Sequence, residues 1–275
     1  MSNESSKHAI PWTGLDVLLF LALWFAAQMV CGVAAGITGA ATGHNTPSPQ
    51  IQIQVQESGE IHVQQKEEKH HGHGVYQMVE QSKKSPFVFM LLFITIVIAA
   101  PLIEELLFRL FLQGWLESKL LQLNLPGASG VAVVAVSLLF ALLHGGITGA
   151  MHIYVLYVLF ITMTISSLLI FALGIYYLMA MRNMKLSECL FGSEPFFRPH
   201  FFANTGWCIL ALLFVIGISA ALEVSFPDIN TDPVPIFFFS LALGYLYSKT
   251  RNLSYCILLH AGLNVTSLTV AWLTV

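Results

Sequence analysis

The 275-residue sequence is 56% hydrophobic and only 10% charged, with a mean hydropathy of +0.73. Soluble domains carry about 25% charged residues, so the composition excludes an ordinary soluble protein. The net charge of −3 provides no basic surface for nucleic acid. We therefore expect an integral, multi-pass membrane protein with lipid as a partner. Its membrane would be the plasma membrane in a prokaryote or the endoplasmic reticulum in a eukaryote.

Apolar runs predict seven spanning helices, because a span needs about 20 such residues. The first run is too long for a signal-peptide core, which predicts a retained N-terminal anchor over residues 1–40. The predicted fold class is therefore all-α, a polytopic transmembrane bundle of about seven to eight helices. The predicted spans are 15–40, 87–112, 130–147, 151–180, 205–224, 234–248 and 253–273.

Residues 41–86 form the one long polar segment, which we expect to lie outside the membrane. Within it, IQIQVQ and IHVQQ alternate apolar and polar residues on either side of a glycine-containing turn, which predicts a β-hairpin. His70, His71 and His73 follow and offer metal-binding side chains, although a solvated flexible loop is the favoured explanation for them. Residues 87–275 are predicted to form the functional domain.

Short loops rich in Lys and Arg predict the orientation in the membrane. Loops 181–204 and 249–252 are basic, whereas loop 225–233 is acidic. The first two are therefore predicted to be cytoplasmic, with the N-terminus inside and segment 41–86 outside. The cysteines form no C-x-x-C pair, so free thiols are expected at Cys31, Cys189, Cys208 and Cys256.

An unusual cluster of charge interrupts the second predicted span. After seventeen uncharged positions, Glu104, Glu105 and Arg109 follow within six residues. A charged side chain near the bilayer centre costs roughly 2.5–3.5 kcal/mol. Glu105 and Arg109 are four residues apart and can pair on one helix face. Glu104 points about 100° away and is left as a candidate general base, although an ion-pair network that stabilises the bundle is an equal alternative.

Two other apolar segments each carry a histidine. Phe140 precedes His144 by four residues, so its ring is expected to pack over the imidazole. His260 and Asn264 are also four apart and share a helix face. A core histidine or an interhelical hydrogen bond would explain each of them singly. Their combination with the two glutamates favours a catalytic site that cuts peptide bonds.

Two chemistries fit these residues. In one, Glu104 takes a proton from water, His260 with Asn264 stabilises the oxyanion, and His144 positions the water or protonates the leaving amine. In the other, His144, His260 and Glu104 bind Zn²⁺, which lowers the pKa of bound water. Zn²⁺ is thus the only cofactor that these residues suggest. The sequence does not decide between the metal-free and the Zn²⁺ chemistry.

Three motifs in this order resemble the CPBP family, which includes type II CAAX prenyl endopeptidases and bacteriocin-processing or immunity proteins. They are E-E-x-x-x-R at Glu104–Arg109, F-x-x-x-H at Phe140–His144 and H-x-x-x-N at His260–Asn264. The resemblance covers about residues 87–270. It implies an intramembrane endopeptidase whose catalytic residues are Glu104, Glu105, His144, His260 and Asn264, with Arg109 and Phe140 as structural support. Its substrate would be a membrane-associated peptide or protein, either prenylated at a CAAX C-terminus or carrying a leader.

The chain departs from this family pattern between the second and third motifs. There, 115 residues separate His144 from His260, where the family usually has about one span. We therefore expect a helical insertion around residues 150–224.

Other function classes remain open from the sequence. Gly217-Ile218-Ser219-Ala220 fits the loose pattern of a rhomboid-type serine protease, but that reading leaves the glutamates and Arg109 unexplained. A proton-coupled transporter also buries Glu and His, yet the chain lacks the internal repeats typical of transporters. A non-catalytic membrane scaffold would tolerate loss of Glu104.

Overall fold

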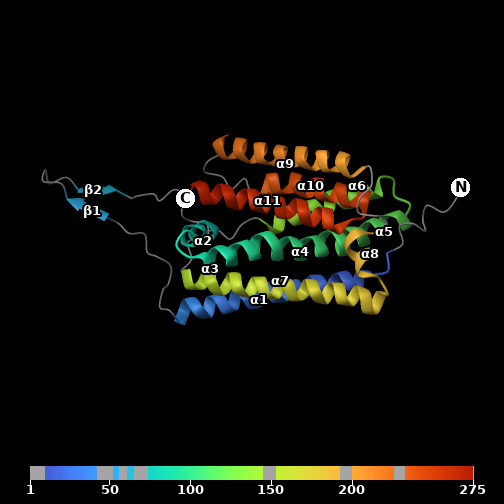
Figure 1. The fold of residues 1–275 in the computed structure, drawn as a ribbon, viewed down its shortest axis with the longest axis horizontal. Coiled ribbons are helices and arrows are strands. Elements are labelled where there is room, and N and C mark those ends of the chain that lie inside the picture. The colour runs from blue at the N-terminus through green and yellow to red at the C-terminus, as the bar shows by residue number, and fades with distance from the viewer. Residues whose placement is uncertain are drawn as a thin grey trace.

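A computed structural model of the chain describes residues 10–41, 52–55, 61–64, 74–144, 153–192, 200–225 and 233–274. It is a bundle of long helices with a small β-hairpin projecting from one end (Figure 1). The elements are α1 (Gly14–Ala41), β1 (Gln52–Val55), β2 (Ile61–Gln64), α2 (Gly74–Ser82), α3 (Pro86–Leu92), η2 (Phe93–Ala99), α4 (Ala100–Glu105), η3 (Leu106–Gln113), α5 (Gly114–Gln122), α6 (Ala128–Leu143), α7 (Ile153–Arg182), α8 (Leu186–Phe191), α9 (His200–Ser225), α10 (Pro233–Thr250) and α11 (Leu253–Thr274).

Residues 86–122 form one long helix at the centre of the bundle, made of α3, η2, α4, η3 and α5. On one side it packs against α7, which in turn packs against α1. On its other side lie α6, α10 and α11. A Cβ at Gly174 of α7 would lie only 2.6 Å from Cδ2 of Leu106, so glycine permits this close approach.

The central helix is buried on every side around its middle. Six successive residues of η3, from Leu106 to Phe111, have at most 4% of their surface exposed, and one of them is Arg109. A helix that is apolar on nearly every side lies in a protein core or spans a membrane. Phe108 also packs edge-on against Phe140 of α6, with ring centroids 5.0 Å apart.

Two segments of the central helix, η2 and η3, have the wide turns of a π-helix. Such turns are rare and usually mark a constraint on the backbone. Pro101 lies just after η2, has no N–H, and would clash with the carbonyl four residues earlier in a regular α-helix. The wide turn therefore has an identifiable local cause. The two π-helical segments flank α4, which carries both glutamates.

Within the described ranges, four helices are long and apolar enough to cross a membrane: Gly14–Thr38, Pro86–Gln122, Tyr154–Arg182 and Leu253–Thr274. A shorter apolar helix covers Ala128–Leu143. These helices confirm the all-α bundle, with helices α9 and α10 at the remaining two predicted spans. The helix that carries the second predicted span, 87–112, continues past it to Gln122. Gly145 and Gly146 lie outside the described residues.

The hairpin expected in the polar segment is present. Strands β1 and β2 pair antiparallel, with Gln52 opposite Gln64 and Val55 opposite Ile61. Its intervening turn, and the histidines at 70, 71 and 73, lie outside the described residues, so their metal binding stays a prediction. Figure 1 shows the hairpin beyond the end of the bundle at which α2 lies.

Polar contacts tie the helices together at the opposite end of the bundle. Asp16 of α1 accepts hydrogen bonds from Tyr177 and, at 2.5 Å, from Nη2 of Arg182, both on α7. Glu117 of α5 accepts from Nη2 of Arg251 at 2.6 Å and from Oγ of Ser248 at 3.1 Å. The start of α1, the end of α7 and the loop before α11 therefore lie at the same end of the bundle. The predicted orientation requires this, because it places the N-terminus and both basic loops on the same side of the membrane.

Free thiols were expected, and Cys31, Cys189 and Cys256 are buried and form no disulfide within the described part of the chain. The side chain of Cys208 is outside the described part of the chain. Burial raises the pKa of the Cys189 thiol on α8, which lies outside the apolar spans.

The orientation in the membrane stays a prediction with a direct test. Lys185 is exposed in the basic loop after α7, so a Lys185→Cys variant of a cysteine-free protein presents a labelling site there. We expect a membrane-impermeant maleimide to label it only after the cytoplasmic face is opened. Ser58→Cys in the polar segment should show the opposite pattern, and labelling of Lys185→Cys from outside would reverse the orientation.

Candidate active site

Two adjacent carboxylates of α4 point in different directions, as successive helical residues must. Glu105 is completely buried, and both of its oxygens are bound. Oε2 accepts a hydrogen bond from Nε of Arg109 at 3.1 Å, which is the predicted pair. Oε1 accepts from Nδ1 of His260 at 2.8 Å. Glu105 therefore links the central helix to α11, a contact between residues 155 apart in the chain.

Arg109 extends this chain of contacts to α10. Its Nη2 donates to Oγ of Ser240 at 2.7 Å, and both residues are fully buried. Its guanidinium also lies 5.5 Å from the centroid of the Phe140 ring. A buried charge is tolerated when it is paired and hydrogen-bonded. The series Ser240, Arg109, Glu105 and His260 thus fixes the imidazole of His260 from three helical segments.

This series predicts that Ser240→Ala destabilises the protein by about 1.5–3 kcal/mol, because Nη2 of buried Arg109 would lose its acceptor. Ser137 on α6 is the matched control, since it is equally buried but its Oγ has no hydrogen-bond partner among the residues described. Ser137→Ala should be nearly neutral. Thermal unfolding in detergent measures both variants, and equal losses would mean that the Ser240 hydrogen bond adds nothing.

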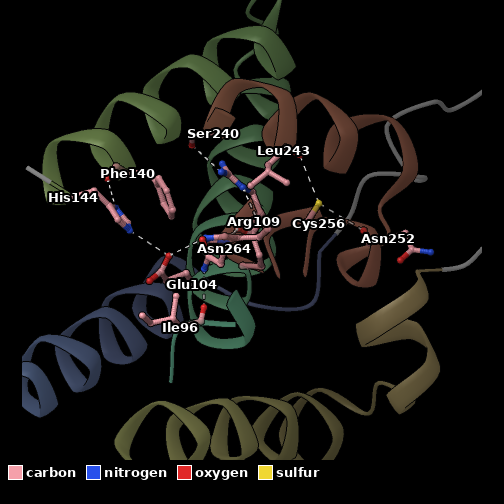
Figure 2. Close-up of polar contacts among 12 residues, drawn as sticks. Ile96, Glu104, Arg109, Phe140, His144, Ser240, Leu243, Asn252, Cys256 and Asn264 are labelled. Atoms are coloured by element: carbon pink, nitrogen blue, oxygen red, sulfur yellow. Dashed lines mark hydrogen bonds and ion pairs between the residues drawn. The ribbon is translucent and has the colours of Figure 1, made fainter. Parts of the chain in front are cut away.

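His144 lies at the end of α6 and is held by Phe140 in two ways. Its Nδ1 donates to the carbonyl oxygen of Phe140 at 2.7 Å. The two rings also stack, with centroids 4.1 Å apart, as the four-residue spacing predicted. With Nδ1 engaged, Nε2 of His144 faces Oε2 of Glu104 at 3.3 Å. Figure 2 draws this ion pair.

His260 directs its second nitrogen to the same carboxylate oxygen. Its Nδ1 donates to Glu105, so Nε2 lies 3.7 Å from Oε2 of Glu104. Phe140 and Phe239 contact the imidazole edge-on from either side, with centroid distances of 6.0 and 5.4 Å. Two imidazoles from different helices therefore converge on one oxygen.

Glu104 differs from its neighbour because its Oε2 is buried yet makes no hydrogen bond of good geometry with any residue that the structure describes. Its side chain is 14% exposed, whereas that of Glu105 is 0% exposed. An unpartnered carboxylate oxygen in a buried site costs free energy. Such cost is usual where a group must remain available to a ligand or a reactant.

Asn264 lies one turn after His260 on α11 and contacts the same central helix. Its Nδ2 donates to the carbonyl oxygen of Ile96 in η2 at 2.7 Å (Figure 2). His260 and Asn264 share one face of α11, as predicted. On that face, His260 binds Glu105 of α4, and Asn264 binds the backbone of η2, the segment just before α4. One amide hydrogen of Asn264 remains for another acceptor, since Nδ2 carries two.

The metal hypothesis was tested on the arrangement of the side chains. Among the residues that the structure describes, no group of three or more His, Cys, Asp or Glu could hold a metal ion. Binding of Zn²⁺ by Glu104, His144 and His260, the ligands expected from the sequence, therefore gains no support here and stays a prediction. We derive no step through a metal.

Sequence reasoning missed the partners that α10 supplies. Ser240 sits in an apolar run with no motif, and only its burial beside Arg109 identifies it. One turn of the helix later, the carbonyl of Gly244 accepts from Nε2 of Gln113 at 2.8 Å. A Cβ at Gly244 would lie 3.0 Å from Oε1 of Gln113, so glycine allows this approach. The sequence features that could have indicated this contact are Gly244, which begins GYLY, and Gln113, a polar residue within an apolar run.

The serine of the rhomboid alternative is not part of this cluster. Ser219 is exposed on α9, a helix at the edge of the bundle that packs against α10 (Figure 1). A serine nucleophile needs a base within hydrogen-bond reach. The described contacts give no support to that alternative.

Comparison with known proteins agrees with the cluster of glutamates and histidines. Residues 86–266 match the family described as type II CAAX prenyl endopeptidase Rce1-like. The match covers every residue of the cluster, from Ile96 to Asn264. No curated protein and no solved structure matches the chain. Together with the apolar helices, the match shows that this integral membrane protein belongs to the type II CAAX prenyl endopeptidase Rce1-like family, and thus to a family of proteases.

Proposed function

We propose that this multi-pass protein hydrolyses peptide bonds of membrane-associated substrates with a water molecule activated by Glu104. The observation that carries the proposal is the buried Oε2 of Glu104, which makes no hydrogen bond of good geometry with the described residues and faces Nε2 of both His144 and His260. A general base must lie within hydrogen-bond reach of the proton that it takes. An oxygen already bound to an arginine, as in Glu105, would be a weaker base.

In the first step, Glu104 takes a proton from water as the water oxygen attacks the carbonyl carbon of the scissile bond. His144 positions that water through Nε2, which can accept a hydrogen bond from it because Nδ1 donates to the carbonyl oxygen of Phe140. The C–N bond then breaks, and the proton passes to the leaving nitrogen either from Glu104 or through His144. The products are a carboxylate and an amine, so no co-reactant other than water is needed.

The tetrahedral intermediate carries an oxyanion that needs hydrogen-bond donors. We assign this role to Nε2 of His260, when it carries a proton, and to the second amide hydrogen of Asn264. Glu105 acts through His260, because its Oε1 holds Nδ1 and thereby sets the direction of Nε2. Arg109 and Phe140 support the site without touching the substrate.

The substrate class follows from the family rather than from the cluster itself. Type II CAAX prenyl endopeptidases are named for prenylated CAAX C-termini, and an apolar bundle can admit a lipid-modified peptide laterally. Leader or bacteriocin peptides are the second class considered. A catalytic centre on membrane-spanning helices fits both, since each substrate would reach it along the membrane.

The substrate test compares three peptide sets with the purified protein in detergent. They are a fluorogenic prenylated CAAX peptide, the same peptide without the prenyl group, and a pool of leader peptides. We expect release of the C-terminal fragment from the prenylated peptide and at least about tenfold slower cleavage without the prenyl group. Cleavage of leader peptides alone would assign the second class, and no cleavage of any peptide would favour a scaffold.

A further inference from the structure

One backbone carbonyl in the central helix has lost its usual donor. In an α-helix, the carbonyl of Ile96 would bind the N–H of Ala100, but that N–H binds the carbonyl of Thr95 instead. In the wider π-helical turn, its donor would be residue 101, which is a proline without an N–H. Neither register can therefore satisfy the carbonyl of Ile96.

Asn264 supplies the missing donor from another helix. Its Nδ2 lies 2.7 Å from the carbonyl oxygen of Ile96, although the two residues are 168 apart in the chain. A carbonyl oxygen only accepts hydrogen bonds, so this contact fixes the side-chain amide with its nitrogen towards η2. The turn created by Pro101 thus determines how Asn264 is oriented.

The same turn is held from its opposite side by α7. Oγ1 of Thr95 lies 2.5 Å from Oγ1 of Thr164 and also donates to the carbonyl of Leu91. Both threonine side chains are buried. The wide turn is therefore clamped between α7 and α11, immediately before the segment that carries Glu104.

We propose that Pro101 is a positioning residue for the active site. By leaving the carbonyl of Ile96 without a main-chain donor, it creates the anchor that orients Asn264 and holds α11 against α4. His260 lies one turn before Asn264 on α11, so the anchor also fixes the distance between His260 and Glu104. The expected effect on catalysis rests on the function proposed above. The replacement of a main-chain donor by Asn264 at the carbonyl of Ile96 does not depend on that function.

The first test is Pro101→Ala, which restores an N–H that can bind the carbonyl of Ile96. We expect kcat on the prenylated peptide to fall about 10–100-fold, with KM changed less than about threefold, because the reacting groups shift while substrate binding persists. The apparent Tm should rise or stay equal, because proline is unfavourable inside a helix. A fully active Pro101→Ala variant would overturn the proposal.

Pro86→Ala is the matched control on the same helix. Pro86 occupies the first turn of α3, where its missing N–H leaves no helical carbonyl without a donor. We expect kcat and KM of this variant to equal those of the wild type. An equal loss of kcat in both variants would show a general effect of removing proline and would contradict the role of Pro101.

A second test needs no activity. Asn264→Ala should lower the apparent Tm by about 3–8 °C in the wild type, because it leaves a carbonyl without a donor. In the Pro101→Ala background the loss should be less than half as large, since the backbone then satisfies that carbonyl. Equal losses in both backgrounds would overturn the proposal. If the wild type cleaves no peptide, the proposed function fails, and this comparison still decides the role of Pro101.

Discussion

Glu104→Gln should reduce kcat/KM for peptide cleavage by about 10³-fold, because the amide cannot take a proton from water. The side chain keeps its size, and Oε2 of Glu104 makes no hydrogen bond of good geometry with the described residues; its contacts with His144 and His260 are at 3.3 and 3.7 Å. The variant should therefore fold and insert like the wild type. Initial rates of cleavage of a fluorogenic peptide in detergent, at matched protein concentration, measure the effect.

Glu80→Gln provides the control for this change. Glu80 is exposed on α2, so the same exchange there should leave the cleavage rate unaltered. Retention of more than about a tenth of the wild-type rate by Glu104→Gln would exclude Glu104 as the base. In that case, His144 and His260 would be the remaining candidates for the general base. The ion-pair network around Glu104 would then have only a structural role.

The second large effect concerns stability rather than chemistry. Arg109→Ala should lower the free energy of unfolding by about 3–5 kcal/mol, because it strands the charge of Glu105, which is 0% exposed. It also leaves Oγ of Ser240 without its donor. Denaturant unfolding of the protein in detergent, followed by tryptophan fluorescence, measures this loss.

Lys119→Ala is the control for Arg109→Ala, because Lys119 is exposed on the same long helix and its side chain donates to Gln122 three residues later. We expect a change within about 0.5 kcal/mol. If Arg109→Ala unfolds at the wild-type denaturant concentration and remains active, the pairing with Glu105 does not stabilise the site. Combining Arg109→Ala with Glu105→Gln should recover part of the loss, since the stranded charge is then removed.

Contacts within one helix could be predicted from the sequence. The four-residue spacing predicted the pair of Glu105 with Arg109 and the stacking of Phe140 on His144, and both contacts are present. The reason is geometric, because residues four apart share a helix face whatever the surroundings. The apolar runs likewise predicted the long helices, since length and hydropathy decide which segments can span a bilayer.

Contacts between helices could not be predicted in the same way. Ser240 meets Arg109 across 131 residues, and His260 meets Glu105 across 155 residues. Such pairs depend on how α10 and α11 pack against the central helix, and apolar sequence leaves that packing undetermined. Glu105 illustrates this limit. Its four-residue spacing predicted the pair with Arg109 on the same helix, but nothing in the sequence indicated its hydrogen bond to His260 on α11.

The π-helical turns were a further limit of the sequence. Pro101 was visible from the start, yet a proline can kink, break or widen a helix. The outcome depends on whether another group satisfies the freed carbonyl, and here Asn264 does so from α11. Asn264, which the H-x-x-x-N motif identified as a catalytic candidate, therefore also binds the carbonyl of Ile96, a contact that the motif did not reveal.

The most direct test of Glu104-activated hydrolysis is the initial rate at which the wild type and Glu104→Gln cleave the prenylated CAAX peptide, each with and without chelator. We predict that cleavage by the wild type continues in chelator and that Glu104→Gln is inactive in both conditions. Cleavage by the wild type that stops in chelator and returns with added Zn²⁺ would contradict the account, as would a Glu104→Gln variant that cleaves at the wild-type rate.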